Sequence, residues 1–180
     1  MATANEIVAK AKSYIGTKEN PLGSNNVIFN TDYYGHAVSG SSYAWCCVFV
    51  WDVFRMCGAS DLFYDGKKTA YCPTLQAWGK KAGLSVPTSD VRAGDIVLFD
   101  WNGNKDPDHV GIATGIINNG VFPTVEGNIN DAVCAMSRQP GQVCCVLRPK
   151  YASGGADASM LDCIRKLIKE AKEIIKELEV

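Results

Sequence analysis

Histidine is scarce in this sequence, and several features that mark common protein classes are missing. Only two histidines, His36 and His109, occur among the 180 residues, and no two cysteines have the Cys-x-x-Cys spacing. The sequence therefore offers no ligand pattern for a structural zinc site, and we expect no metal to be bound in this way. No run approaches the roughly 20 consecutive apolar residues that a membrane-spanning helix requires, so no membrane span is expected.

Charge of one sign is not in excess either. Lysine and arginine total 18 against 19 acidic residues, a net charge of −1, and no basic stripe follows the chain. Because nucleic-acid binding depends on concentrated positive charge, we expect no nucleic-acid partner. The first turns contain Asn5, Glu6, Lys10 and Lys12, so they lack the uninterrupted apolar core of a signal peptide. We therefore expect synthesis in the cytoplasm without a signal peptide.

Cysteine, by contrast, is abundant, with eight in the chain and two adjacent pairs, Cys46-Cys47 and Cys144-Cys145. Adjacent cysteines are poor disulfide partners, and without an export signal reduced thiols are the expectation. Most of the cysteines are expected to be small buried hydrophobic residues. The remaining question is whether one of the thiols is chemically active.

Composition divides the chain near residue 152. Residues 1–151 mix short apolar segments, turns and aromatic residues, and 152–159 (ASGGADAS) are typical of a flexible linker. Residues 160–180 are strong helix formers whose apolar positions are spaced alternately 3 and 4 apart, as in a heptad repeat. We expect this amphipathic helix to pack on the preceding domain, on a second copy of the chain or on a partner subunit. Homo-oligomerisation or a partner subunit bound through 160–180 is the corresponding hypothesis.

Within the first region, helices are expected before strands. Apolar periodicity and helix-ending residues predict helices near 4–15, 44–57 and 74–82, whereas Tyr33-Tyr34-Gly35 is assigned to a loop. From Gly94 onward, short β-branched segments bounded by turn residues predict consecutive strands. Helices followed by strands predict an α+β domain, with N-terminal helices packed on an antiparallel sheet.

The segment YAWCCVFVWDVF, residues 43–54, puts two adjacent cysteines at the start of an expected helix, after the capping candidates Ser41 and Ser42. A cysteine in the first turn meets unpaired N–H groups and the positive end of the helix macrodipole. Both favour the nucleophilic thiolate. Adjacent helical residues point about 100° apart, so only one of Cys46 and Cys47 can face a cleft. Position alone does not choose between them, and a buried core cysteine is the competing interpretation.

A cysteine nucleophile needs a base, and the two histidines differ in their surroundings. His36 lies in a polar loop rich in tyrosine and glycine, which is typical of a surface histidine. His109 begins an expected strand in which it shares one face with Gly111, Ala113 and Gly115. That face has little side-chain bulk, as if another group must approach the histidine. His109 is therefore the candidate base.

The strand after His109 returns through a hairpin signal. A two-residue loop at either Asn118-Asn119 or Asn119-Gly120 places Glu126 on the same sheet face as His109. Only the first of these loops brings the two residues to the diagonal distance of about 7–8 Å. Glu126 or Asn128 is then the candidate to orient the imidazole, and a polar strand end is the competing interpretation.

These motifs together resemble the CHAP domain, the cysteine, histidine-dependent amidohydrolases/peptidases. WCCVFVW is similar to the nucleophile motif of that family, and RAGDIVLFDWNG with DHVGIATG resembles its strand–loop–strand that carries the histidine. TVEGN resembles the acid segment and VLRPKY the closing strand. The resemblance covers about residues 1–151 and implies a papain-like CHAP fold. The related NlpC family has an Asp-Cys-Ser-Gly nucleophile motif, which this chain lacks.

The resemblance also implies a role for each matched residue. Cys46 becomes the nucleophile, because the family's cysteine directly follows the tryptophan of the motif. His109 becomes the general base, Glu126 orients it, and Asn128 is a polar helper. Separately from the resemblance, aromatic residues are candidates to line a substrate groove, although aromatic side chains more often belong to a core. We name Trp45, Tyr34 and Trp101 as the candidate substrate-binding residues.

The implied function is hydrolysis of an amide bond in bacterial peptidoglycan. The family contains N-acetylmuramoyl-L-alanine amidases and endopeptidases of the stem peptide or cross-bridge, and the sequence does not separate them. The resemblance implies a phage endolysin that acts on the cell wall after holin-dependent release. The alternative is a non-catalytic cell-wall-binding or assembly module with a CHAP-like fold.

No cofactor is required for this chemistry. Some members of the family bind calcium through the loop ahead of the cysteine, where this chain offers Asp32. A second acidic segment, residues 100–108, alternates Asp and Asn but is not an EF-hand. Lys105 replaces the required glycine of such a loop, and Gly111 replaces its bidentate acid.

Overall fold

The computed structural model describes residues 2–152 and Ile168. The linker expected at 152–159 and the helix expected at 160–180 thus lie outside the described residues, except for Ala152 and Ile168. None of the helices in the described part has the length and apolar character needed to cross a bilayer. The described chain consists of helices and one sheet, which gives an α+β architecture.

Four α-helices form, and three of them correspond to the segments predicted from the sequence. Their bounds are Ala4–Ser13 for α1, Ile28–Tyr34 for α2, Cys46–Met56 for α3 and Cys72–Lys81 for α4. Helix α1 begins with a capping box, in which Thr3 accepts from the backbone N–H of Glu6 and the Glu6 side chain returns to Thr3. Local sequence thus fixes where this first helix begins.

Helix α2 was not predicted, because its segment was assigned to a loop. Its N-cap, Val27, makes no side-chain hydrogen bond, and the helix ends at Gly35 with a left-handed φ of 81°. Phe29 is buried within it and stacks on Trp45 with ring centroids 5.5 Å apart. Packing against α3 therefore stabilises a short helix whose start carries no capping signal.

The sheet has six strands, and every neighbouring pair is antiparallel. The bounds are Ser85–Val86 for β1, Ile96–Phe99 for β2, His109–Ala113 for β3, Phe122–Ile129 for β4, Ala132–Arg138 for β5 and Val143–Leu147 for β6. The order across the sheet is β1-β6-β2-β3-β4-β5. This confirms the predicted α+β class and the antiparallel sheet.

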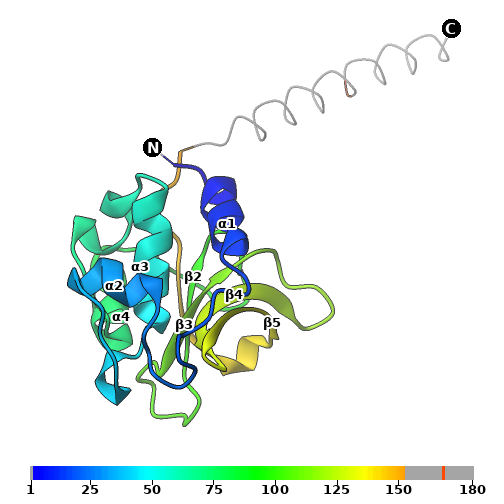
Figure 1. Ribbon diagram of the computed structural model, residues 1–180. Helices are drawn as coiled ribbons and strands as arrows, with labels where there is room; N and C mark the ends of the chain where they lie inside the picture. Colours follow the sequence, from blue (N-terminus) through cyan, green and yellow to red (C-terminus); the bar gives the residue numbers. More distant parts are fainter. Residues whose placement is uncertain (1, 153–167, 169–180) are drawn as a thin grey trace, which may run out of the picture.

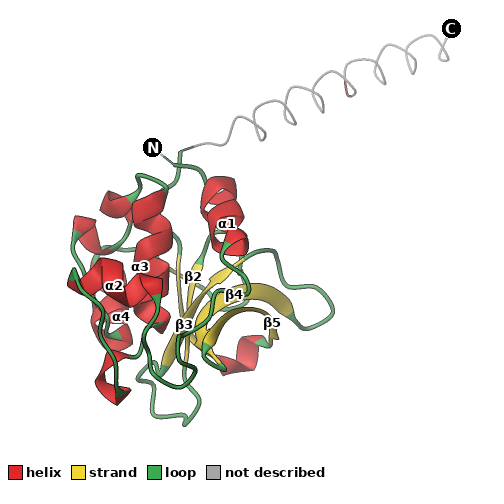
Figure 2. Cartoon of the chain, in the orientation of Figure 1, coloured by secondary structure: helices red, strands yellow, loops and turns green. Residues whose placement is uncertain are grey.

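Helix α3 is the central helix of the fold, and it packs on β3 and β4. All nine of its residues from Cys46 to Phe54 are buried, so its apolar sequence belongs to the core. A Cβ added to Gly127 in β4 would lie 2.5 Å from the Cβ of Phe49, so only glycine permits this close approach. Figures 1 and 2 show α2, α3 and α4 gathered on one side of the sheet. The first turn of α3 therefore meets the middle strands.

Candidate active site

Cys46 is the first residue of α3, and Trp45 is the N-cap. The predicted caps are wrong: Ser41 and Ser42 belong to a separate 3-10 turn, Ser41–Tyr43. Trp45 makes no side-chain hydrogen bond to the helix, so no cap occupies the N–H groups of the first turn. These N–H groups, which point out of the helix beside Cys46, are suitable donors to an oxyanion.

His109 and Glu126 meet across β3 and β4. Nε2 of His109 lies 3.0 Å from Oε2 of Glu126, and both side chains are almost completely buried. The register pairs Ile112 with Val125, which puts Gly111 opposite Glu126 and His109 on the diagonal. A Cβ on Gly111 would lie 2.5 Å from Cγ of Glu126. The low-bulk face predicted around His109 is therefore the space that Glu126 occupies.

The hairpin combines the two expectations: its loop is Asn119-Gly120, but the strands have the register expected from a loop at Asn118-Asn119. Asn118 and Val121 exchange backbone hydrogen bonds around the loop Asn119-Gly120, whose residues have positive φ as a type I′ turn requires. That loop alone would not bring Glu126 near His109. Closer to the strands, however, three residues at 115–117 face a single residue of β4, which shifts the pairing by two. An irregularity in the hairpin, rather than the loop itself, sets the site's register.

Glu126 is completely buried and has three side-chain partners. Arg138 donates from Nε to Oε1 at 2.9 Å and from Nη2 to Oε2 at 2.6 Å, and Thr124 donates to Oε1. Burial alone would raise the pKa of Glu126, but the hydrogen bonds from Arg138, His109 and Thr124 outweigh it and lower the pKa to about 2. Glu126 is therefore a carboxylate throughout the physiological range.

Arg138 and Thr124 were not predicted from the sequence. Thr124 lies two residues before Glu126 in the same strand, so it shares the face of Glu126 and could have been found from period-two spacing. Arg138 comes from the next strand, β5, and only the β4–β5 register brings it to Glu126. No local signal in the sequence distinguishes this arginine from the others.

The imidazole of His109 lies between the carboxylate and the thiol of Cys46. Burial lowers the pKa of His109, but hydrogen bonds with Cys46 and Glu126 and their charges outweigh it and raise the pKa to about 9. Since Nε2 faces Glu126, Nδ1 is the nitrogen left for the sulfur. Cys46, His109 and Glu126 thus form one continuous chain of contacts from helix to sheet.

The two adjacent cysteines have different surroundings. Cys46 is 7% exposed and interacts with His109, whereas Cys47 is fully buried. The Sγ atom of Cys46 also lies 3.8 Å from Sγ of Cys72, the first residue of α4. This contact and burial raise the pKa of Cys46, and the hydrogen bond to His109 opposes them. The structure therefore brings Cys46, and not Cys47, into contact with His109, the candidate base.

The other predicted residues are distributed unequally around this centre. Trp101 is 45% exposed and lies face to face with His109, with ring centroids 6.1 Å apart. Asn128 has a left-handed φ of 63° at the irregular end of the β4–β5 pairing, two residues after Glu126. Among the described residues, no side-chain hydrogen bond joins it to the three central residues. Its role as a polar helper remains a prediction.

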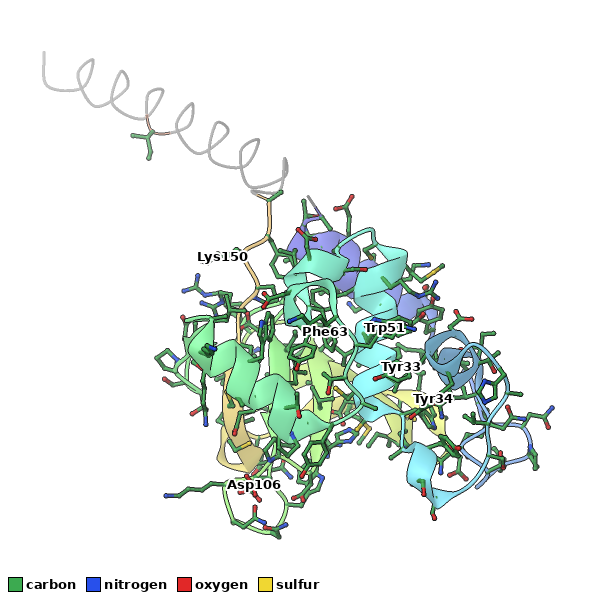
Figure 3. All side chains as sticks on the ribbon, turned by 90° about the vertical axis from the view of Figure 1, so that its left-hand side faces the viewer. Tyr33, Tyr34, Trp51, Phe63, Asp106 and Lys150 are labelled. Atoms are coloured by element: carbon green, nitrogen blue, oxygen red, sulfur yellow. The ribbon has the colours of Figure 1, made fainter. Side chains whose placement is uncertain are left out.

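The remaining two aromatic residues lie elsewhere. Trp45 is completely buried and donates its indole N–H to Glu19 at 2.7 Å, so the proposed substrate-binding residue is instead part of the core. Tyr34 packs edge-on against Tyr33, at 4.9 Å between ring centroids. Figure 3 shows both tyrosines well away from Asp106 in the loop that follows Trp101. Contact between Tyr34 and a substrate remains a prediction.

A cavity of about 390 Å³ lies between α4 and the β2–β3 loop. It is lined by Gln76 and Lys80 of α4, by Asp100 and Lys105 of the loop, and by Cys144 of β6. Gln76 follows Cys72 by one helical turn and contacts the Cys144 thiol at 3.6 Å. The cavity is thus a polar space along the helix whose first residue contacts Cys46.

Asp32, the residue that the sequence offers for calcium, has an arginine partner, and calcium binding there remains a prediction. The carboxylate of Asp32 is paired with the guanidinium of Arg55, which also binds Asp52 at 2.6 Å. A cation at Asp32 would have to displace this arginine. In the described part of the chain, no three His, Cys, Asp or Glu side chains are grouped to hold a metal ion. All seven cysteines of that part are free thiols.

Comparison with known families identifies the domain. A family model described as the CHAP domain matches residues 38–128, half of the chain, including Cys46, His109, Glu126 and Asn128. The chain belongs to the CHAP family. CHAP is a family of amidase and peptidase hydrolases that act on peptidoglycan, and this is the family to which the chain belongs. No curated protein sequence matches it.

Comparison with solved structures shows a similar fold over most of the chain. The wild-type endolysin LysIME-EF1 is 19% identical, with a TM-score of 0.52, over 85% of this chain and 67% of that chain. Ly7917 is 17% identical over 82% of this chain and 63% of its own length, with a TM-score of 0.47. Ly7917 with the hydrolyzing product of MDP is 16% identical, also with a TM-score of 0.47. The likeness to LysIME-EF1 is one of fold, and the chain spans about two-thirds of the length of these proteins.

Proposed function

We propose that this protein is an endolysin-like peptidoglycan hydrolase that cleaves an amide bond with Cys46 as the nucleophile. The observation that carries the proposal is the position of the His109 imidazole between the Cys46 thiol and the Glu126 carboxylate. Nε2 of the imidazole lies 3.0 Å from Oε2 of Glu126. A base placed between a thiol and an orienting acid is the arrangement that nucleophilic catalysis by cysteine requires. The CHAP match over the same residues supports the assignment.

The reaction follows from this geometry in two halves. The Cys46 thiolate attacks the amide carbon, and N–H groups of the first turn of α3 stabilise the tetrahedral oxyanion. His109, as an imidazolium, gives its proton to the leaving amine while the C–N bond breaks, which leaves a thioester on Cys46. Neutral His109 then takes a proton from water, the hydroxide attacks the thioester, and the carboxylic acid product leaves. Glu126 holds the imidazole in place and stabilises its charged form.

Two bond classes fit the proposal. An N-acetylmuramoyl-L-alanine amidase and an endopeptidase of the stem peptide or cross-bridge both break an amide by the same steps. Trp101 is exposed beside His109, which supports a contact with substrate at this position. Mass spectrometry of fragments released from purified walls would identify the bond by its new amine end.

The proposed place of action is the cell wall, reached after holin-dependent release from the cytoplasm. No step of the proposed reaction uses a metal, because the nucleophile, the base and the oxyanion donors all come from the chain. Clearing of purified walls should therefore be unchanged by a chelator and by added calcium. A requirement for calcium would contradict this expectation, and loss of that requirement in Asp32→Asn would assign the ion to Asp32.

Clearing of purified cell walls tests the central proposal. Wild type, Cys46→Ala and Cys47→Ala provide a matched series, because the two thiols are adjacent in one helix. Loss of clearing with Cys46→Ala alone supports the assignment, and loss with Cys47→Ala alone would move the nucleophile by one residue. Clearing that survives both changes would refute thiol catalysis. If the wild-type protein sediments with the walls but releases no fragments from them, it is a non-catalytic binding module.

A further inference from the structure

Arg138 occupies both oxygens of the buried acid. It is the last residue of β5, and its side chain passes to Glu126 of β4, where it forms two parallel hydrogen bonds of 2.9 and 2.6 Å. Oε1 also accepts from Thr124, and Oε2 also faces His109. The carboxylate therefore cannot rotate away from the imidazole without breaking a bidentate pair in a buried site.

The guanidinium is itself held by aromatic rings. Its central carbon lies 5.3 Å from the ring centroid of Phe99 and 4.9 Å from that of Trp101. The two rings are nearly parallel, at 5° and 5.2 Å, and both also stack on His109. Arg138 and His109 thus share one aromatic support as well as one carboxylate oxygen. Cation–π attraction favours the charged arginine in this place.

We propose that Arg138 is a positioning residue for the reaction, which fixes the Glu126 carboxylate against His109 and shares its negative charge with the imidazole. The inference rests on the proposed hydrolase function and deepens it, because the side-chain hydrogen bonds of Arg138 all go to Glu126 and Arg138 acts on His109 through that carboxylate. A carboxylate that serves the imidazole alone would bind the imidazolium more tightly. The arginine thus divides the charge, so that His109 can still release its proton during each turnover.

The charge argument gives a sign. Glu126 raises the pKa of His109. A positive guanidinium bonded to the same oxygen should limit that effect, because like charge disfavours the imidazolium. Arg138→Gln removes the charge and one arm of the pair, so the pKa of His109 should rise. Arg138→Lys keeps the charge but loses the fork, so the pKa should stay near the wild-type value while the rate falls.

Nuclear magnetic resonance can follow His109 directly, because the chain has only two histidines and His36→Gln assigns the signals. The experiment titrates the ring signals of the full chain, with wild type, Arg138→Gln and Arg138→Lys, and measures wall clearing against pH. We expect Arg138→Gln to move both the titration and the ascending limb of activity to higher pH, with a rate at least roughly tenfold lower at neutral pH. We expect Arg138→Lys to lower the rate without moving the limb.

Arg148→Gln is the matched control. Arg148 makes the same bidentate contact to a buried carboxylate, that of Asp95, which has no hydrogen bond to a histidine in the described part of the chain. Arg148 also pairs with the exposed carboxylate of Asp90. Arg148→Gln should lower the melting temperature without changing the pH at which His109 titrates. An unmoved titration in Arg138→Gln, or an equal shift in Arg148→Gln, would overturn the proposal. If Arg138→Gln does not fold, a rate unchanged in Arg138→Lys overturns it. The titration needs no activity, so a wrong hydrolase assignment, revealed by clearing that survives Cys46→Ala, would be recognised separately.

Discussion

Two buried carboxylates in this domain are held by arginine in almost the same way. Arg138 binds Glu126 at 2.9 and 2.6 Å, and Arg148 binds Asp95 at 2.9 and 2.8 Å, in both cases through Nε and Nη2. The difference lies in what else each carboxylate meets. Glu126 faces the imidazole of His109, whereas the remaining bond to Asp95 comes from a backbone N–H.

The two pairs lie at opposite ends of one strand. Asp95 directly precedes β2, and Arg148 directly follows β6, so this pair joins the start of one strand to the end of its neighbour. At the other end of β2, Phe99 pairs with His109 and packs on Arg138. The comparison teaches that an arginine–carboxylate pair serves the fold by itself. It serves the candidate site only where a group that can exchange a proton joins it.

The largest effect is expected from Glu126→Gln. This change keeps the shape of the side chain but removes the charge that stabilises the imidazolium, so the pKa of His109 should fall. Wall clearing should decrease by about 10²- to 10⁴-fold, the range known for loss of an orienting acid. The measurement is the clearing rate per folded molecule, with circular dichroism as the check on folding. Retained activity would show that the reaction does not need the charge of Glu126, and that Glu126 and Asp95 do not differ in function.

The second effect concerns the structural pair. Asp95→Asn removes the buried charge that pairs with Arg148 and leaves the guanidinium only the exposed carboxylate of Asp90, so the free energy of unfolding should fall by roughly 3 kcal/mol. Urea unfolding measures this change. The clearing rate per folded molecule should stay within about twofold of wild type, because the pair does not touch His109. A large loss of specific activity with unchanged stability would contradict the division of roles.

The third effect tests the space that Glu126 occupies. Gly111→Ala would place a Cβ 2.5 Å from Cγ of Glu126, and the carboxylate would have to move. We expect the clearing rate to fall about tenfold and the stability by roughly 1–3 kcal/mol. Gly141→Ala is the matched control, because a Cβ there meets no atom within 4 Å. Equal behaviour of the two variants would show that the site tolerates displacement of Glu126.

The fourth effect is the dependence of activity on pH. Both Cys46 and His109 have raised pKa values, so at neutral pH the pair holds one proton more than the reaction needs. Activity should therefore increase with pH up to about 9. Cys72→Ala removes a contact that raises the pKa of Cys46, so the ascending limb should move to lower pH. A clearing rate that is independent of pH between 6 and 9 would contradict both statements.

The last effect is a trend of stability with pH that runs opposite to that of activity. The folded pKa of His109, about 9, exceeds its ordinary value of 6.5, so the imidazolium stabilises the fold below pH 6.5. This contribution, on the order of 3 kcal/mol, should be lost as the pH rises through 9. Urea midpoints measured at pH 6.5 and 9.5 give the change. His109→Gln should remove most of the difference, and its persistence would assign the trend to other groups.

Much of the fold was predictable because its signals are local. Apolar periodicity located three helices, and β-branched segments between turn residues located strands β2 to β6, whereas β1, which precedes Gly94, was not predicted. Helix α2 was missed because its stabilisation comes from Phe29 packing on Trp45, which no local pattern reports. Trp45 was misplaced for a related reason. Adjacency to Cys46 in the sequence suggested the cleft, but the helix start turns its ring into the core.

In the candidate site too, some features follow from local sequence and others from long-range packing. By itself, the sequence determined which residue types were available: a thiol at a helix start, one histidine on a low-bulk strand face, and an acid on the following strand. Only the tertiary structure decided that Cys46 rather than Cys47 meets His109, and that Arg138 holds Glu126. Those outcomes depend on strand register and on the distance between helix and sheet. Both are set by long-range packing, which no short stretch of sequence encodes.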